Sequence, residues 1–145
     1  MMRHILDTNA LISYVTDRDP DQQRQVAPLF EASARLESAL LCPQHVLSEF
    51  VYVLQNIYNV DSDRIAAILR DFISMPGVEI VHEVHFETLL SLWPDPVRDF
   101  GDAIVASVAK RGKGAEIVTF DRKFGAVLRK IGLKHHVNII RREDS

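Results

Sequence analysis

The stretch His4-Ile5-Leu6-Asp7-Thr8-Asn9 is a short apolar run that ends in three polar residues. Asp, Thr and Asn favour turns and helix starts, because their side chains hydrogen-bond to nearby backbone groups. The stretch therefore predicts a first β-strand that ends at Asp7 and is followed by a short helix over residues 9–15.

Apolar runs and helical patterns continue to alternate along the rest of the chain. Apolar residues at i, i+3 and i+4 predict helices over residues 21–36, 46–58, 62–73, 86–93, 99–111 and 122–131. Short apolar runs predict strands over residues 40–42, 78–81, 117–119 and 137–140. We therefore expect an α/β fold in which a short, parallel-rich sheet lies between two helical layers, an α/β/α sandwich. No break in composition divides the chain, so residues 1–145 are expected to form a single domain.

The composition limits the class of protein. The chain has 145 residues, of which 47% are hydrophobic and 26% charged, with a net charge of −3. These values exclude a disordered polyelectrolyte, and the lack of low-complexity blocks excludes a fibre. The single cysteine, Cys42, excludes a disulfide framework and an all-cysteine zinc site. No apolar run approaches the roughly 20 residues that span a bilayer, and Asp7 interrupts the start before a signal-peptide core can form. We expect a soluble, cytoplasmic protein.

The charges are unevenly distributed along the chain. Up to Ala109 there are 7 Lys and Arg residues against 16 Asp and Glu, whereas from Lys110 to Ser145 there are 10 against 4. A mildly acidic total is therefore compatible with a basic surface that binds a polyanion. An ordinary solvated face rich in lysine would account for the same segment.

Four acids fall at the junctions between the expected elements. Asp7 follows the first strand, Asp121 follows a later strand, and Asp99 and Asp102 open a helix. In an open parallel sheet, ligands bind beyond the carboxyl ends of the strands. We therefore expect Asp7 and Asp121 to point into one crevice, toward which the helix start directs a further acid.

Glu49 differs from these acids because it interrupts an apolar helix. We expect it to face inward or along the border of the apolar face, where an unpaired charge is costly. Each acid taken alone has an ordinary structural role: Asp99 as an N-cap, Asp7 or Asp121 as a turn residue, and Glu49 as a surface acid paired with a base. These roles leave the convergence of several acids on one sheet edge unexplained.

Together the acids form a candidate site for a divalent metal ion. Clustered carboxylates repel one another and raise each other's pKa unless a cation neutralises them. An oxygen-rich site of this kind suits Mg²⁺ or Mn²⁺ better than zinc. The sequence contains neither a Gly-rich phosphate loop before a helix nor a Gly-x-Ser-x-Gly nucleophile elbow.

Four motifs follow one another in a defined order along the chain. They are Ile5-Leu6-Asp7-Thr8-Asn9-Ala10-Leu11-Ile12, Ser48-Glu49-Phe50, Asp99-Phe100-Gly101-Asp102-Ala103 with Ala106-Ser107, and Thr119-Phe120-Asp121-Arg122-Lys123-Phe124. In this order and spacing they resemble the motifs of PIN-domain ribonucleases, and most closely those of the VapC-like toxins of toxin–antitoxin pairs. The resemblance runs from about residue 4 to residue 140.

The resemblance implies a PIN-like fold with an acidic site that binds Mg²⁺ or Mn²⁺. The implied ligands are Asp7, Glu49, Asp102 and Asp121, with Asp99 as an accessory, and Asn9 and Thr119 are implied to orient them. A bound metal would lower the pKa of a water molecule and hold the scissile phosphate. The implied reaction is endonucleolytic hydrolysis of RNA that leaves a 5′-phosphate and a 3′-hydroxyl, without a side-chain nucleophile.

An acidic pocket needs basic residues around it to hold RNA, and the C-terminal segment can supply them. Arg122 and Lys123 directly follow Asp121, so we expect them to contact phosphates. Arg111 and Lys113 are further candidates for RNA binding, from the end of the helix that Asp102 opens.

Several functions remain open at this point. A toxin of this type is implied to be a homodimer, held silent by a small antitoxin protein that inserts a segment into the acidic groove. The alternatives are a PIN-family nuclease that processes RNA outside toxin–antitoxin control, and a non-catalytic PIN-fold binding module. A receiver-type phosphoryl-transfer domain is disfavoured, because Asp7-Thr8-Asn9 offers neither a paired acid nor an Asp-x-Asp-x-Thr pattern.

Overall fold

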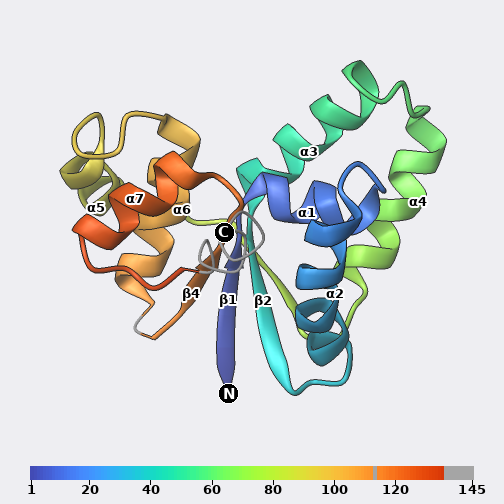
Figure 1. Ribbon diagram of the computed structural model, residues 1–145, viewed down its shortest axis with the longest axis horizontal. Helices are drawn as coiled ribbons and strands as arrows, with labels where there is room; N and C mark the ends of the chain where they lie inside the picture. The colour runs from blue at the N-terminus through green and yellow to red at the C-terminus, as the bar shows by residue number, and fades with distance from the viewer. Residues whose placement is uncertain (113, 136–145) are drawn as a thin grey trace.

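A four-stranded sheet lies at the centre of the molecule in the computed structural model, which describes residues 1–112 and 114–135 (Figure 1). Its strands are β1 (Met2–Leu6), β2 (Ser38–Pro43), β3 (Val78–Val81) and β4 (Glu116–Val118). The strand order is β3-β2-β1-β4, and each neighbouring pair is parallel. In the central strand, Ile5 lies opposite Leu41 on one side and Ile117 on the other.

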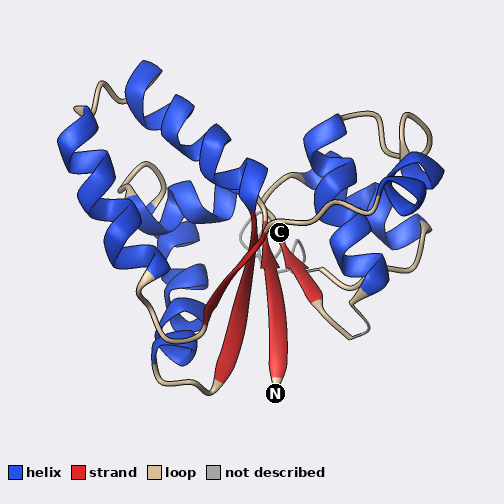
Figure 2. Ribbon diagram, turned by 180° about the vertical axis from the view of Figure 1, so that it is seen from behind, coloured by secondary structure: helices blue, strands red, loops and turns tan. Residues whose placement is uncertain are grey.

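Helices cover both faces of this sheet, as Figures 1 and 2 show. One layer contains α1 (Thr8–Val15), α2 (Pro20–Ala34), α3 (Gln44–Asn56) and α4 (Ser62–Ile73). The other layer contains α5 (Phe86–Leu92), α6 (Phe100–Arg111) and α7 (Arg122–Lys130). The predicted α/β/α sandwich is therefore confirmed, with a sheet that is parallel throughout the described residues.

Each helix and strand expected before residue 136 is present, with ends that differ from the predicted ones by at most two residues. The strand expected over residues 137–140 lies outside the described residues. His135, the last described residue, forms a parallel bridge with Ile117 of β4. The Ile117 amide also donates a hydrogen bond to the Lys134 carbonyl at 2.9 Å.

The strand order places a topological switch point between β1 and β4. From β1 the chain moves outward through β2 to β3, and it then crosses back so that β4 lies on the other side of β1. The connections that leave β1 and β4 therefore diverge to opposite faces of the sheet. A crevice opens beyond the carboxyl ends of two such strands, which is where open α/β sheets bind ligands.

The centre of the core is formed by strand residues that are apolar on both faces of the sheet, and helix residues pack against them. Ile5, Leu6, Leu40 and Leu41 are each no more than 2% exposed, as expected for a parallel sheet covered by helices on both sides. Burial raises the pKa of the Cys42 thiol to about 12, which leaves this cysteine a core residue. In the part of the chain that the structure describes, no helix is both long and apolar enough to cross a membrane.

Candidate metal centre

Asp7 stands at the carboxyl end of β1 and caps α1. Its side chain accepts hydrogen bonds from the Thr8 amide at 2.9 Å and from the Thr119 hydroxyl at 2.7 Å. The Asp7 amide donates to the Val118 carbonyl at 3.0 Å, which joins the end of β1 to the end of β4. Because Asp7 is only 6% exposed, these contacts hold its carboxylate at the switch point with little access to solvent.

Asn9 and Thr119 connect the two strand ends through their side chains. Asn9 Nδ2 donates to Thr119 Oγ1 at 3.2 Å, and Asn9 Oδ1 accepts from the Phe120 amide at 2.9 Å. Thr119 Oγ1, which donates to Asp7, also accepts from the Asp121 amide at 3.1 Å. A single hydroxyl therefore links the Asp7 carboxylate to the loop that carries Asp121. Both residues lie where they would orient the acids.

Asp99 and Asp121 each cap a helix that starts at the switch point. Asp99 accepts a hydrogen bond from the Asp102 amide at 2.9 Å, and Asp121 accepts one from the Phe124 amide at 3.1 Å. Asp102 lies in the first turn of α6. Asp99, Asp102 and Asp121 line one cavity of about 330 Å³. The starts of α6 and α7 therefore bring together the three acids that the sequence placed on them.

Glu49 lies on α3 with an exposed side chain. Of the two positions expected for it, inward or along the border of the apolar face, the structure excludes the inward one. Glu49 accepts a hydrogen bond from the Thr8 hydroxyl. A Cβ added at Gly101 of α6 would lie 3.0 Å from Glu49 Oε2 and 3.2 Å from Asp99 Oδ1. The start of α6 therefore packs against both carboxylates, and Glu49 belongs to the same site.

The carboxylates interact electrostatically as one group. Burial raises the pKa of Asp7 from 3.8 to about 6; repulsion from Glu49 and Asp121 acts in the same direction, whereas the hydrogen bonds from Thr119 and Thr8 lower it. Burial likewise raises the pKa of Asp102 to about 8, with added repulsion from Asp7, Asp99, Asp121 and Glu49. A cation bound among these acids would relieve both effects.

The chemistry of the donor set fits a hard divalent cation. The donors are carboxylate oxygens from four separate elements, the type that Mg²⁺ and Mn²⁺ prefer. Among residues 1–112 and 114–135, no three His, Cys, Asp or Glu side chains lie close enough together to form a complete ligand set. Hydrogen bonds from Thr8, from Thr119 and from the amides at the helix starts hold the carboxylates separately.

Basic residues flank the acid cavity on the α7 side. Lys123, which the sequence marked as an RNA contact, lines the cavity together with Asp121. Arg122 is the first residue of α7. Arg98, which no sequence motif indicates, also lines the cavity, because the segment before α6 borders the acids.

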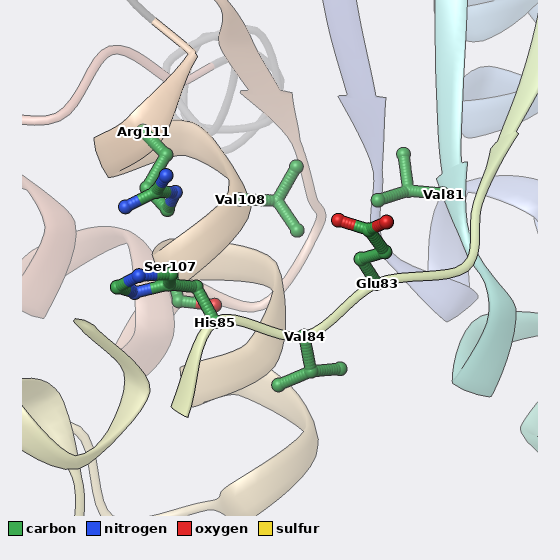
Figure 3. A pocket seen from close by; sticks show the side chains of 7 residues that line it. All are labelled: Val81, Glu83, Val84, His85, Ser107, Val108 and Arg111. Atoms are coloured by element: carbon green, nitrogen blue, oxygen red, sulfur yellow. The ribbon is translucent and has the colours of Figure 1, made fainter. Parts of the chain in front are cut away.

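Arg111 lies elsewhere, at the opposite end of α6 from Asp102. It lines a separate pocket of about 260 Å³ with Glu83 and His85 (Figure 3). Figure 3 shows Glu83 across this pocket from Arg111 and His85. Arg111 therefore does not line the acid cavity, because a helix that points its first turn at the site carries its last turn away from it, and its contact with RNA stays a prediction. Lys113 lies outside the described residues.

Three further residues of the site were not identified from the sequence. Thr8 and Gly101 lie inside quoted motifs, but their contacts with Glu49 depend on how α1, α3 and α6 pack. A Cβ at Gly101 would also lie 3.5 Å from His45 Cδ2, and burial lowers the pKa of this histidine. A glycine between two site acids is the one sequence signal that could have indicated a close approach.

These observations define a class of protein, an α/β/α sandwich with an acidic, oxygen-rich site at the switch point of a parallel sheet. Comparison with family models then identifies the family. The model described as the PIN domain matches residues 4–130. The chain belongs to the PIN domain family.

Individual proteins are also similar to this chain, one in sequence and two in fold. The chain is 22% identical over 130 residues to a protein named "VapC ribonuclease" from Aquifex aeolicus (strain VF5), a match that covers 90% of this chain and 93% of that protein. Its fold is similar to that of VapBC2 from Rickettsia felis, solved with a DNA fragment from the promoter, with a TM-score of 0.64, 17% identity and coverage of 93% and 98% of the two chains. A solved protein from Pyrobaculum aerophilum has a TM-score of 0.61, 18% identity and coverage of 99% and 98%.

Proposed function

We propose that this protein is a metal-dependent endoribonuclease that hydrolyses RNA phosphodiester bonds. The observation that carries the proposal is the group of acids at the switch point, Asp7, Glu49, Asp102 and Asp121, in which the pKa values of Asp7 and Asp102 are raised to about 6 and about 8. Raised pKa values indicate carboxylates in need of a cation. Membership of the PIN domain family and the similarity to a VapC ribonuclease favour the same chemistry.

Each residue of the site has a proposed role in this reaction. Asp7, Glu49, Asp102 and Asp121 would hold Mg²⁺ or Mn²⁺, with Asp99 as an accessory ligand, and the metal would supply water activation and neutralise charge on the phosphate. Thr119 and Asn9 would orient Asp7, since the Thr119 hydroxyl and Asn9 Nδ2 both donate to Asp7 Oδ2. Lys123 and Arg98 line the cavity and would bind phosphate oxygens, assisted by Arg122. The water oxygen bonds to phosphorus as the bond to the 3′-oxygen breaks, which leaves a 5′-phosphate and a 3′-hydroxyl.

We further propose that the protein acts in the cytoplasm as the toxin of a toxin–antitoxin pair. The similarity to a VapC ribonuclease and to VapBC2 supports this role. A small antitoxin protein would occupy the acidic groove, and the toxin itself would be a homodimer formed by single-domain chains of residues 1–145. A gene for a small DNA-binding protein next to this one would support the assignment. Its absence would favour a nuclease of RNA processing.

The proposal is tested by cleavage of a structured RNA in Mg²⁺, in Mn²⁺ and in EDTA. Asp102→Asn removes one proposed ligand, and we expect it to lower the cleavage rate by about 100-fold or more, because the charge that would bind the metal is lost. Asp71→Asn on α4 is the matched control, since Asp71 is exposed and lies outside the site. Undiminished cleavage in EDTA, or equal cleavage by Asp102→Asn, would contradict the metal chemistry.

Calorimetry distinguishes the nuclease from a binding module that keeps the fold without the reaction. Titration of the wild-type protein with Mn²⁺ should release or absorb heat, and Asp102→Asn should weaken or abolish that signal. RNA binding without metal binding or cleavage in the wild-type protein would favour the binding module.

A further inference from the structure

Arg18 lies in the loop between α1 and α2, and its guanidinium is anchored on one side by hydrogen bonds. Nε donates to Ser13 Oγ at 3.1 Å, and Nη2 donates to Ser13 Oγ at 2.8 Å and to the Asn9 carbonyl at 3.0 Å. Nη2 also lies 3.4 Å from Gln22 Oε1. The guanidinium is therefore fixed beside Asn9, a residue of the acidic site.

The anchor itself is rigid. Ser13 is fully buried, and its hydroxyl donates to Gln22 Oε1 at 2.7 Å, so the serine and glutamine hold each other in place. The loop is fixed as well, because Gln23 Nε2 donates to the Tyr14 and Thr16 carbonyls at 3.1 and 3.2 Å. A long side chain normally loses conformational entropy when it binds a ligand. In Arg18 the hydrogen bonds to Ser13 and Asn9 already restrict the side chain, so less conformational entropy remains to be lost when a ligand binds.

One edge of the anchored guanidinium remains available. Within residues 1–112 and 114–135, no hydrogen-bond acceptor contacts Nη1, and no carboxylate forms an ion pair with Arg18. Arg24 on the following helix, α2, differs in this respect, because it forms an ion pair with Asp21. The residue is exposed. Arg18 therefore presents an unpaired positive charge with two unused N–H donors.

Arg18 lines a pocket that adjoins the acidic site. Asn9, Arg18, Asp19, Gln22 and Phe120 line this pocket of about 340 Å³. Asn9 and Phe120 separate it from Asp7 and Asp121, because the Phe120 amide donates to Asn9 Oδ1. The one acid in the pocket, Asp19, caps α2 by accepting hydrogen bonds from the Asp21 and Gln22 amides at 3.1 Å.

We propose that Arg18 binds a phosphate of the RNA strand next to the phosphate that is cleaved. An oriented guanidinium with two free donors matches the geometry of a phosphate oxygen pair. The pocket adjoins the acids through Asn9 and Phe120, and Arg18, between α1 and α2, belongs to the helical layer opposite α7, which carries Lys123. RNA that enters the acid cavity would thus be held by cations on both sides of the cleaved bond. This inference rests on the proposed ribonuclease function and adds a residue from the acidic half of the sequence to the RNA-binding surface.

The test removes one positive charge from the protein and one negative charge from the RNA, separately and together. Binding is measured in the Asp102→Asn background, with RNA that carries one neutral methylphosphonate at each position in turn around the cleavage site. We expect one flanking methylphosphonate to weaken binding by about tenfold with Arg18 present, and to have almost no effect with Arg18→Gln. Arg18→Gln should also lower the salt slope of RNA binding by about one.

Matched variants separate this role from a structural one. Arg24→Gln removes a charge from α2 and should keep the full methylphosphonate effect. Ser13→Ala loosens the anchor and leaves the charge, so it should weaken binding while keeping the salt slope. A methylphosphonate effect that persists in Arg18→Gln, with an unchanged melting temperature, would overturn the inference even though RNA is bound. Wild-type protein that neither binds nor cleaves RNA would overturn the proposed function and this inference with it.

Discussion

At the scale of single residues, the raised pKa values of Asp7 and Asp102 make stability depend on pH. In the folded protein the pKa of Asp7 is about 6 and the pKa of Asp102 is about 8, against 3.8 for an ordinary aspartate. Between these limits the folded state binds more protons than the unfolded chain, so the free energy of unfolding falls as pH rises. This part of the stability is fully present at pH values below about 4, and it is lost as the pH rises through the folded pKa values.

The stabilisation by Asp102→Asn in EDTA should therefore be larger at pH 8 than at pH 5, and it should vanish below about pH 4. We expect the melting temperature at pH 8 to rise by about 2–5 °C, which corresponds to roughly 1 kcal/mol after allowance for solvent screening of a partly buried group. Melting curves of both proteins from pH 5 to pH 8 provide the measurement. A variant whose advantage over the wild type does not grow with pH would contradict the proposed electrostatic coupling.

Gly101 offers a second prediction at this scale. An alanine Cβ would lie 3.0 Å from Glu49 Oε2, a contact that the flexible glutamate relieves by moving a few tenths of an ångström. Since alanine favours a helix over glycine by about 1 kcal/mol, Gly101→Ala should keep or raise the melting temperature. Cleavage should nevertheless fall, because Glu49 no longer occupies its place beside Asp99. Unchanged cleavage with unchanged stability would show that the position of Glu49 is not critical.

At the scale of elements, the site is assembled from helix starts. Asp7, Asp99 and Asp121 are the N-caps of α1, α6 and α7. The structural and functional interpretations of these acids are therefore compatible. In Asp99 and Asp121, Oδ1 caps the helix and leaves Oδ2 for a cation, whereas Asp7 Oδ2 also accepts a hydrogen bond from Thr119. The positive ends of the helix dipoles also favour negative charge at these positions. Capping thus fixes the acids in position before any ligand binds.

This dual role predicts that stability and activity can be separated. Asp121→Asn keeps a good N-cap, so it should change the free energy of unfolding little and yet abolish most cleavage. Asp121→Ala should cost about 1 kcal/mol in addition. Asp61→Ala is the control, since Asp61 caps α4 through the Arg64 amide at 3.0 Å and lies outside the site. It should lose similar stability and cleave normally. Normal cleavage by Asp121→Asn would exclude Asp121 as a ligand.

The elements also show what a single sequence can predict. The structure has Asp7 and Asp121 as N-caps after a strand and Asp102 in a first helical turn, as the sequence predicts, because in a parallel sheet such positions meet at one edge. Glu49 was placed only in part, because its neighbours on α3 do not specify which flank of the helix meets α6. Arg18 could not be identified, since its role depends on a loop that folds back on Ser13 and Asn9. The position of a residue along one helix or strand can be predicted from the sequence, whereas its contacts with other helices or strands cannot.

At the scale of the whole molecule, the site joins parts of the chain that are far apart in sequence. The four principal acids come from β1, α3, α6 and the loop after β4. The net charge of −3 conceals this concentration of acid, which lies between a basic α7 on one side and Arg18 on the other. A divalent cation bound here would therefore cross-link both helical layers through the sheet edge.

Such a cross-link should stabilise the fold in a spatially defined way. A ligand that binds only the folded state adds about 2.7 kcal/mol at 100 times its Kd, so saturating Mn²⁺ should raise the melting temperature by several degrees. Hydrogen exchange should slow most at the amides of Asp102 and Phe124, which donate to the capping acids. The amide of Arg64 makes the same kind of bond to Asp61 away from the site and should respond only to the global change. Equal protection of all three amides would indicate that the ion binds elsewhere. If Mn²⁺ slows exchange at none of these amides in the wild-type protein, and Asp102→Asn behaves in the same way, the proposed metal site is contradicted.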